Sequence, residues 1–220
     1  MQKIGFCDKY SLTQAVLNGT KPMTRRVEKG LETFEFDYEV HFAHSLEIIN
    51  QYWDEEKNSL AIITPQGKMK VPTRYKLGEV VAVAQAYKDA GIDPHYLMFA
   101  TVKEKFSCVE KEIEAMFTKG WSNKMFVRPD LMPHQIKISD IKIERLQDIS
   151  DEDCLKEGIV KFDYGFFVPN LYRIPSRGVL YSYKTPREAF ATLIDKRGVG
   201  RPGLWVLNPW VVVYEFKLVK

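Results

Sequence analysis

Three cations and two hydroxyls lie within ten residues near the start of the chain. Residues 17–26 read Leu-Asn-Gly-Thr-Lys-Pro-Met-Thr-Arg-Arg. The ammonium of Lys21, the hydroxyl of Thr24 and the guanidinium groups of Arg25 and Arg26 can together bind a polyanion or polarise a carbonyl group. A solvated basic loop has the same composition, so the rest of the chain must decide between these interpretations.

The residues around this stretch predict a helix followed by a strand. Ser11 is a suitable N-cap for a helix over 12–18, and Gly19 is suited to end it because glycine accepts a left-handed backbone. Pro22 prevents the helix from resuming. We therefore expect residues 23–27 to be extended.

Alternation along this strand sorts its side chains onto two faces. Thr24 and Arg26 are expected on one face, and Met23 and Arg25 on the other. The chemistry of the stretch therefore depends on which elements cover each face.

Composition is typical of a soluble globular protein. The 220 residues are 45% hydrophobic and 28% charged, and the net charge of +3 is too small to indicate nucleic-acid binding without local clustering. No apolar run is long enough for a transmembrane helix, and the N-terminus has no signal-peptide core. We expect a cytoplasmic protein that does not bind membranes.

Cysteine and histidine spacing indicates neither a disulfide framework nor a metal site. The three cysteines, Cys7, Cys108 and Cys154, are odd in number and widely spaced, which suits reduced thiols. No Cys-x-x-Cys or His-x-x-x-His pair is present. We expect no metal and no other cofactor.

Short strands separated by turns and a few helices predict an α+β fold: a mixed, mostly antiparallel β-barrel decorated with short helices. We expect one domain over 1–220, with an ordered excursion at about 160–184. The expected strands are 4–7, 36–42, a hairpin of 60–63 and 68–71, 80–86, 98–102, 136–146 and 210–218. In the longest of them, 136–146, the apolar residues switch from one face of the strand to the other at Ser139-Asp140, which indicates a bulge or bend.

Two helices have clear start signals. Ser150 is suited to cap a helix over 151–156, and Thr185 followed by Pro186 and Glu188 is suited to begin another. Shorter helices are expected near 46–52 and within 104–119. The loop over 121–134 contains large side chains and two prolines, so it is either packed across the core or part of a binding surface; both can hold together.

Five motifs in order resemble the ASCH domain, a family of the PUA-like superfold, and most closely its longer phage and prophage members. The resemblance covers most of the chain and is weakest over 28–59 and 162–183. The motifs are Gly19-x-Lys21-x-x-Thr24-x-Arg26, Leu77-Gly78-Glu79, the segment 144–150 (Glu-Arg-Leu-Gln-Asp-Ile-Ser), Glu157-Gly158, and the segment 208–216 (Asn-Pro-Trp-Val-Val-Val-Tyr-Glu-Phe).

This resemblance implies a cleft that faces RNA or a nucleotide. One branch of the family removes the acetyl group from acetylcytidine, and its functional trio corresponds to Lys21, Thr24 and Glu157. Thr24 would act as the nucleophile, Lys21 as base or oxyanion stabiliser, and Glu157 as proton relay to the leaving amine. Lys21 and Glu157 are far apart in the sequence, so only the fold could bring them together.

Two positions depart from the family pattern. Pro22 replaces a residue that is often threonine, and Ala84-Gln85 replaces a charged Arg-Glu pair at the end of a buried strand. If that pair lines the cleft in relatives, Ala84-Gln85 gives this protein a less polar or differently tuned cleft.

Three functions remain open from the sequence. The first is a binding module for RNA or a nucleotide, in which cations contact phosphate and aromatic rings stack on bases. The second is the amidohydrolase, and the third is a phage-derived accessory protein without catalytic activity. The residues expected to bind in the first case are Lys21, Arg25, Arg26, Gln85, Trp121, Lys124, Phe126 and Arg128; core packing explains the aromatic residues equally well.

Overall fold

The computed structural model describes residues 1–31, 47–92, 119–171, 182–197 and 203–219. These residues form two compact units. Unit 1 comprises Met1–Cys7, Val80–Ile136 and Leu218–Lys220, and unit 2 comprises Asp8–Glu79 and Lys137–Lys217. The strands expected at 36–42 and 98–102, and nearly all of 104–119, lie outside the described residues. The single domain over 1–220 stays a prediction.

Unit 1 is built on two short parallel strands. β1 (Gln2–Ile4) pairs with β6 (Val80–Val83), with Lys3 opposite Ala82. β6 is completely buried from its second residue onward, as expected for an apolar run. The strand ends at Val83, although the next residues stay buried.

The loop over 121–134 packs against β6 and the residues that follow, which confirms the first of its two interpretations, packing across the core; the second, a binding surface, stays a prediction. Two short 3₁₀ helices, η3 (Lys124–Phe126) and η4 (Pro129–Leu131), lie within it. Its buried side chains share one cluster with β6 and the residues that follow. The cluster consists of Ala82, Ala84, Tyr87, Val127 and Met132, with Ala90, Ile92, Trp121 and Leu131 packed against it.

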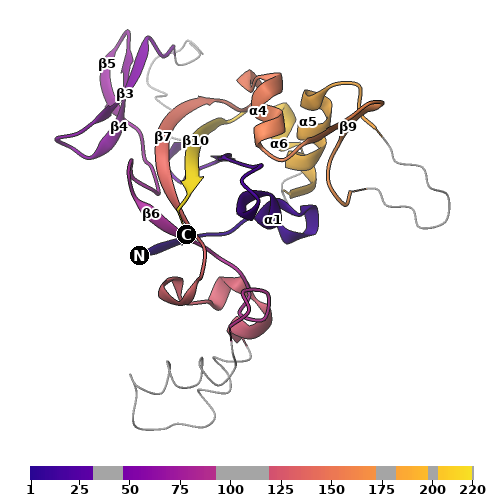
Figure 1. The fold of residues 1–220 in the computed structure, drawn as a ribbon. Coiled ribbons are helices and arrows are strands. Elements are labelled where there is room, and N and C mark those ends of the chain that lie inside the picture. Colours follow the sequence, from indigo (N-terminus) through magenta and orange to yellow (C-terminus); the bar gives the residue numbers. More distant parts are fainter. Residues whose placement is uncertain (32–46, 93–118, 172–181, 198–202, 220) are drawn as a thin grey trace, which may run out of the picture. The chain divides into compact units, whose positions relative to one another are not determined.

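Unit 2 contains three adjacent strands of a sheet. β2 (Met23–Arg26) pairs antiparallel with β10 (Trp210–Leu218), whose other neighbour is β7 (Gln135–Arg145). The expected phase change in β7 is confirmed, because Ile138 and Ile141 are both buried while Ser139 and Asp140 between them are exposed. β7 is strongly curved in Figure 1.

A second, three-stranded antiparallel sheet in unit 2 consists of β3 (Asn50–Asp54), β4 (Ser59–Thr64) and β5 (Gly67–Lys70). The predicted β4–β5 hairpin is confirmed. The helix expected near 46–52 is wrong, because Tyr52 pairs with Ala61 and the segment forms the edge strand of this sheet. Pairing with the buried β4 overrides the helical spacing of its apolar residues.

Helix α1 (Leu12–Leu17) forms where expected, but without the predicted cap. Ser11 has a φ of 53° and its side chain makes no capping hydrogen bond. It joins a 3₁₀ turn, η1 (Asp8–Tyr10), to α1, and its hydroxyl instead accepts a hydrogen bond of 2.6 Å from Asn170 Nδ2.

Helices α4 (Asp151–Lys156) and α5 (Pro186–Arg197) confirm their start signals. The Ser150 hydroxyl accepts the Asp153 N–H at 3.1 Å, and the Thr185 hydroxyl accepts the Glu188 N–H at 3.2 Å. The remaining elements of unit 2 are η5 (Leu146–Asp148), β8 (Val160–Phe162), β9 (Gly165–Phe167) and α6 (Leu204–Leu207). β8 and β9 form a hairpin inside the predicted excursion.

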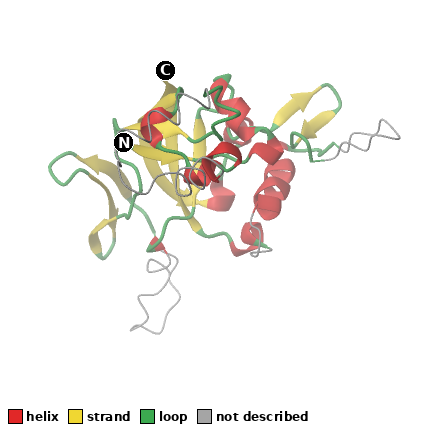
Figure 2. Cartoon of the chain, turned by 90° about the horizontal axis from the view of Figure 1, so that it is seen from below, coloured by secondary structure: helices red, strands yellow, loops and turns green. Residues whose placement is uncertain are grey.

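The described chain is therefore a mixed α+β protein with antiparallel sheets and short helices (Figure 2). Its described strands form no closed barrel, so the barrel expected from the sequence is not found among them. None of the described helices is both long and apolar enough to cross a membrane.

Candidate functional site

The turn after α1 directs Lys21 into the interior of unit 2. Gly19 has a φ of 72°, and its N–H donates to the carbonyl of Val16 at 3.0 Å. The N–H groups of Thr20 and Lys21 both donate to the carbonyl of Ala15, at 2.9 and 3.0 Å. This arrangement is a Schellman-type helix end, which the sequence predicted at Gly19. Lys21 is 1% exposed and is therefore not part of a solvated basic loop.

Glu157 reaches the same interior from the end of α4. Gly158 turns the chain there with a φ of +105°, and a Cβ at this position would lie 2.8 Å from Leu12 Cδ2, so glycine fits this site best. The Lys21 ammonium donates to the Glu157 carbonyl at 2.8 Å and to Glu157 Oε2. The fold thus joins two residues that lie 136 positions apart.

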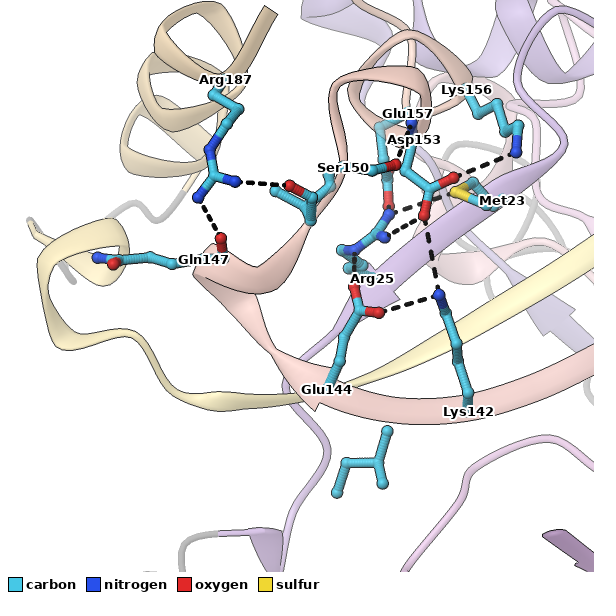
Figure 3. A network of polar contacts seen from close by, with 12 residues as sticks. Met23, Arg25, Lys142, Glu144, Gln147, Ser150, Asp153, Lys156, Glu157 and Arg187 are labelled. Carbon is cyan, nitrogen blue, oxygen red and sulfur yellow. Dashed lines mark hydrogen bonds and ion pairs between the residues drawn. The ribbon is translucent and has the colours of Figure 1, made fainter. Parts of the chain in front are cut away.

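Arg25 connects β2 to three carboxylates. Its Nε donates to Glu144 Oε1 at 2.7 Å, one Nη to Asp153 Oδ2 at 2.8 Å, and the other to Glu157 Oε1 at 3.3 Å (Figure 3). Arg25 is 4% exposed. Its guanidinium is therefore enclosed by protein acids and is not presented to a phosphate.

Two lysines at the periphery complete the network. Lys142 Nζ lies 3.0 Å from Glu144 Oε2, and Lys156 Nζ lies 3.2 Å from Asp153 Oδ1 (Figure 3). We call Lys21, Arg25, Glu144, Asp153 and Glu157, with these two lysines, the Arg25 network.

Arg25 and Asp153 of this network favour their charged forms. Burial alone would raise the pKa of Asp153, but hydrogen bonds from Arg25 and Lys156 outweigh burial and hold that pKa below its usual range. Burial likewise opposes the charge of Arg25, but the carboxylates of Glu157 and Glu144 outweigh it and raise the Arg25 pKa. Arg25 thus connects β2 to β7 through Glu144 and to α4 through Asp153.

Thr24 does not join this network. In the β2–β10 register it is opposite Tyr214, and strand alternation places both on the face opposite Arg25. Thr24 is fully buried, and its hydroxyl has no hydrogen-bond partner in the part of the chain that the structure describes. The structure therefore brings together Lys21 and Glu157 of the expected trio, but leaves Thr24 without a hydrogen bond to either. Arg26 is partly buried, at the end of β2.

Gln85 lies in unit 1, whereas the expected catalytic trio lies in unit 2. It is 7% exposed, and its Oε1 is 2.7 Å from Nδ1 of His134. Its side chain therefore fixes the end of the loop over 121–134.

Three of the four binding residues expected in that loop contact other protein groups. Lys124 Nζ donates to the carbonyl of Phe6, and Arg128 binds Asp130 through two hydrogen bonds of 2.7 and 3.2 Å. Trp121 is half-buried against the core of unit 1.

The same loop exposes two apolar side chains that the Lys124 and Arg128 contacts do not cover. Met125 is 73% and Phe126 56% exposed, and Lys119 Nζ lies 5.9 Å from the centre of the Phe126 ring. Of these residues, only Phe126 was expected to bind from the sequence; Met125 and Lys119 were not. The available signal was a Met-Phe pair shortly after a lysine within a loop.

Comparison with known protein families, curated proteins and solved structures found no match. The ASCH resemblance therefore stays a hypothesis. Among the described residues, no group of three or more His, Cys, Asp or Glu side chains could hold a metal ion.

Proposed function

We propose that the protein binds single-stranded RNA or a nucleotide by stacking a base on Phe126. The observation that carries this proposal is an aromatic ring, 56% exposed, beside the exposed ammonium of Lys119. We call Lys88, Lys119, Met125 and Phe126 the Phe126 surface. Stacking on an exposed aromatic ring contributes about 1–3 kcal/mol per base and tolerates any sequence.

The backbone beneath the Phe126 surface is held in place. Lys3 Nζ donates to the carbonyls of Met125 and Val127, both at 2.7 Å. Asn123 Oδ1 accepts the N–H of Met125 at 3.0 Å, and the hydroxyl of Tyr87 accepts the N–H of Arg128 at 2.9 Å. A ring presented by such a fixed loop loses little conformational freedom when a ligand binds.

Lys119 lies beside the ring, and a second exposed lysine, Lys88, lies on a neighbouring segment; both can contact phosphate. The N–H of Tyr87 donates to the carbonyl of Gly120 at 3.1 Å and that of Lys88 to the carbonyl of Trp121 at 3.3 Å, which brings Lys88 close to the segment that carries Lys119. Neutralising two phosphates of a single strand gives a slope of log K against log salt of about −1.4. Asp89 follows Lys88 and reduces the positive electrostatic potential there. Stacking on Phe126 therefore supplies most of the affinity for RNA.

The test is fluorescence anisotropy with a labelled 12-nucleotide RNA of mixed sequence. Phe126→Ala should weaken binding by about fivefold or more, which corresponds to the lower end of the stacking energy. Tyr52→Ala is the matched control, because Tyr52 is another exposed aromatic residue, with Lys68 Nζ 5.0 Å from its ring centre. Absence of binding by the wild type, or equal loss in both variants, would refute the proposal.

An amidohydrolase acting on an acylated nucleoside is the second candidate, favoured by the Lys21–Glu157 contact and by the hydroxyl of Thr24, which has no hydrogen-bond partner among the described residues. Because two oxygen atoms accept from the Lys21 ammonium, we assign Lys21 to oxyanion stabilisation and not to proton abstraction. The Thr24 Oγ would form a bond to the acyl carbon while its proton passes to Glu157.

The C–N bond of the substrate would then break as Glu157 returns that proton to the leaving amine, and water would hydrolyse the acyl-threonine ester. Because Thr24 lies on the face of β2 opposite Arg25, which contacts Glu157, this mechanism requires β2 to rearrange when the substrate binds, so that Thr24 comes within hydrogen-bond reach of Glu157. Hydrolysis of acetylcytidine by the wild type and by Thr24→Ser, but not by Thr24→Ala or Lys21→Ala, would support it. Equal turnover by all four proteins, or none by the wild type, would exclude it.

A further inference from the structure

Helix α6 exposes two consecutive aliphatic side chains. Val206 is 78% and Leu207 69% exposed. The helix has left-handed residues at both ends, Gly203 with a φ of 84° and Asn208 with a φ of 45°. Single exposed apolar residues are common on protein surfaces and need no explanation. Two adjacent ones on an ordered helix are less common and can mark a binding surface.

Contacts beneath α6 hold this pair in position. The Trp205 ring packs edge-on against Phe190 of α5, with ring centres 6.1 Å apart. The N–H of Trp205 donates to Asp195 Oδ1 at 2.9 Å, and its carbonyl accepts from Gln147 Nε2 at 2.8 Å. Val206 and Leu207 are thus displayed by a fixed backbone.

Arg187 lies beside the same helix, and its hydrogen-bond acceptors among the described residues are neutral. The guanidinium carbon is 6.0 Å from the centre of the Trp205 ring. One Nη donates to the carbonyl of Ile149 at 3.0 Å and the other to the carbonyl of Gln147 (Figure 3). Both acceptors are neutral, and within the described residues no carboxylate forms an ion pair with Arg187.

The guanidinium of Arg187 therefore retains binding capacity. Two of its five N–H groups are used by the carbonyls, which leaves three for an external acceptor. The carbonyls and the Trp205 ring already fix its orientation, so little entropy is lost when it binds.

We propose that Arg187, Trp205, Val206 and Leu207 form a docking surface for an acidic, amphipathic segment of a partner protein. An aliphatic or aromatic side chain of the partner packs on Val206 and Leu207, and a neighbouring carboxylate binds Arg187. Tryptophan and arginine side by side are the residue types that most often dominate protein interfaces. Charge complementarity selects an acidic partner in preference to a neutral or basic one.

A random peptide library tests this proposal on the full chain. Twelve-residue displayed peptides are selected on the wild type, with counter-selection on Val206→Asp. Enriched peptides should combine Asp or Glu with a large apolar residue, and their affinity should fall as salt concentration rises. Failure to enrich such peptides would overturn the proposal.

Variants then assign the binding site of an enriched peptide. Val206→Asp and Arg187→Ala should each raise the Kd at least tenfold, whereas Arg187→Lys should retain part of the affinity because it keeps the charge. Val160→Asp, at a residue of β8 that is 39% exposed, is the matched control for adding an acid and should leave the Kd unchanged. An unchanged Kd in Val206→Asp would refute the assignment.

A competition experiment separates this surface from the proposed RNA site. The 12-nucleotide RNA should not displace the peptide, and Phe126→Ala should bind the peptide as well as the wild type does. Displacement by RNA would show that the surface binds phosphate and would overturn the proposal. Peptide binding without any RNA binding would refute the proposed function alone.

Discussion

Arg25 and Arg187 are two arginines of unit 2 in opposite environments. Arg25 is 4% exposed and donates to three carboxylates. Arg187 is exposed, donates to two backbone carbonyls and lies beside the Trp205 ring. The charge of Arg25 is neutralised inside the protein, whereas that of Arg187 remains available to another molecule.

This difference shows that clustering of cations in a sequence does not locate a basic surface. Lys21 and Arg25 belong to the basic stretch over 17–26, yet both are buried against acids more than a hundred residues away. Arg187 stands outside any such cluster. Long-range pairing decides which cations reach solvent, and local composition carries little information about it.

The sharpest test of the comparison is the same substitution at both arginines. Arg25→Gln should have the largest effect, a loss of about 3–5 kcal/mol in the free energy of unfolding, because it leaves three carboxylates crowded without their shared cation. Urea unfolding followed by circular dichroism measures this loss. A loss below about 1 kcal/mol would contradict the role of Arg25 as the centre of the network.

Variants of the buried Lys21–Glu157 pair test whether stability depends on the ion pair itself or only on leaving no unpaired charge in the interior. Lys21→Met should cost about 2–4 kcal/mol, since it removes one of the two cations that hold the buried carboxylate. The double variant Lys21→Met/Glu157→Leu should recover part of that loss, as coupled neighbours do not add. Strictly additive losses in urea unfolding would show that the two side chains act independently.

The pH dependence of stability gives a smaller effect. The folded-state pKa of Asp153 is depressed, so its contribution to stability is present above its unfolded pKa of about 3.9 and is lost as the pH falls through the folded value. Wild type should therefore exceed Asp153→Asn in urea midpoint at pH 6, and this difference should shrink as the pH falls below 4. A pH-independent difference would contradict the assignment of charge to Asp153.

Arg187→Gln should have the smallest effect on folding. Its removal loses two hydrogen bonds at an exposed position, which we expect to cost no more than about 1 kcal/mol. The measurement is again the urea midpoint, compared directly with Arg25→Gln. Similar losses of unfolding free energy in Arg25→Gln and Arg187→Gln would contradict the conclusion that only Arg25 is needed for stability.

Local signals predicted much of the fold. Ser150 and Thr185 begin helices as expected, and the interrupted alternation in β7 predicted its change of buried face. Predictions failed where distant partners override local preference. Ser11 lost its capping role to the η1–α1 junction, and residues 50–54 pair with β4 instead of forming a helix.

The candidate sites were less predictable than the elements. The approach of Lys21 to Glu157 was expected from the family resemblance alone, because no spacing rule relates residues so far apart. Neither Glu144, near the end of a predicted strand, nor Asp153, near the start of a predicted helix, was expected to belong to a site, although both bind Arg25. Exposure of Met125, Phe126, Val206 and Leu207 depends on how their short helices pack, which composition does not encode.

The long sequence separations within the Arg25 network also bear on how the chain is made. At a synthesis rate of about 5–20 residues per second, Arg25 emerges roughly ten seconds before Glu144 and the α4 acids exist. Lys21 and Arg25 remain hydrated during this interval, and β2 cannot be locked in place by its acids. Because such contacts form late, we expect their loss to accelerate unfolding more than it slows folding. The lifetime of the native state, and not only its equilibrium stability, then depends on this one group of charges.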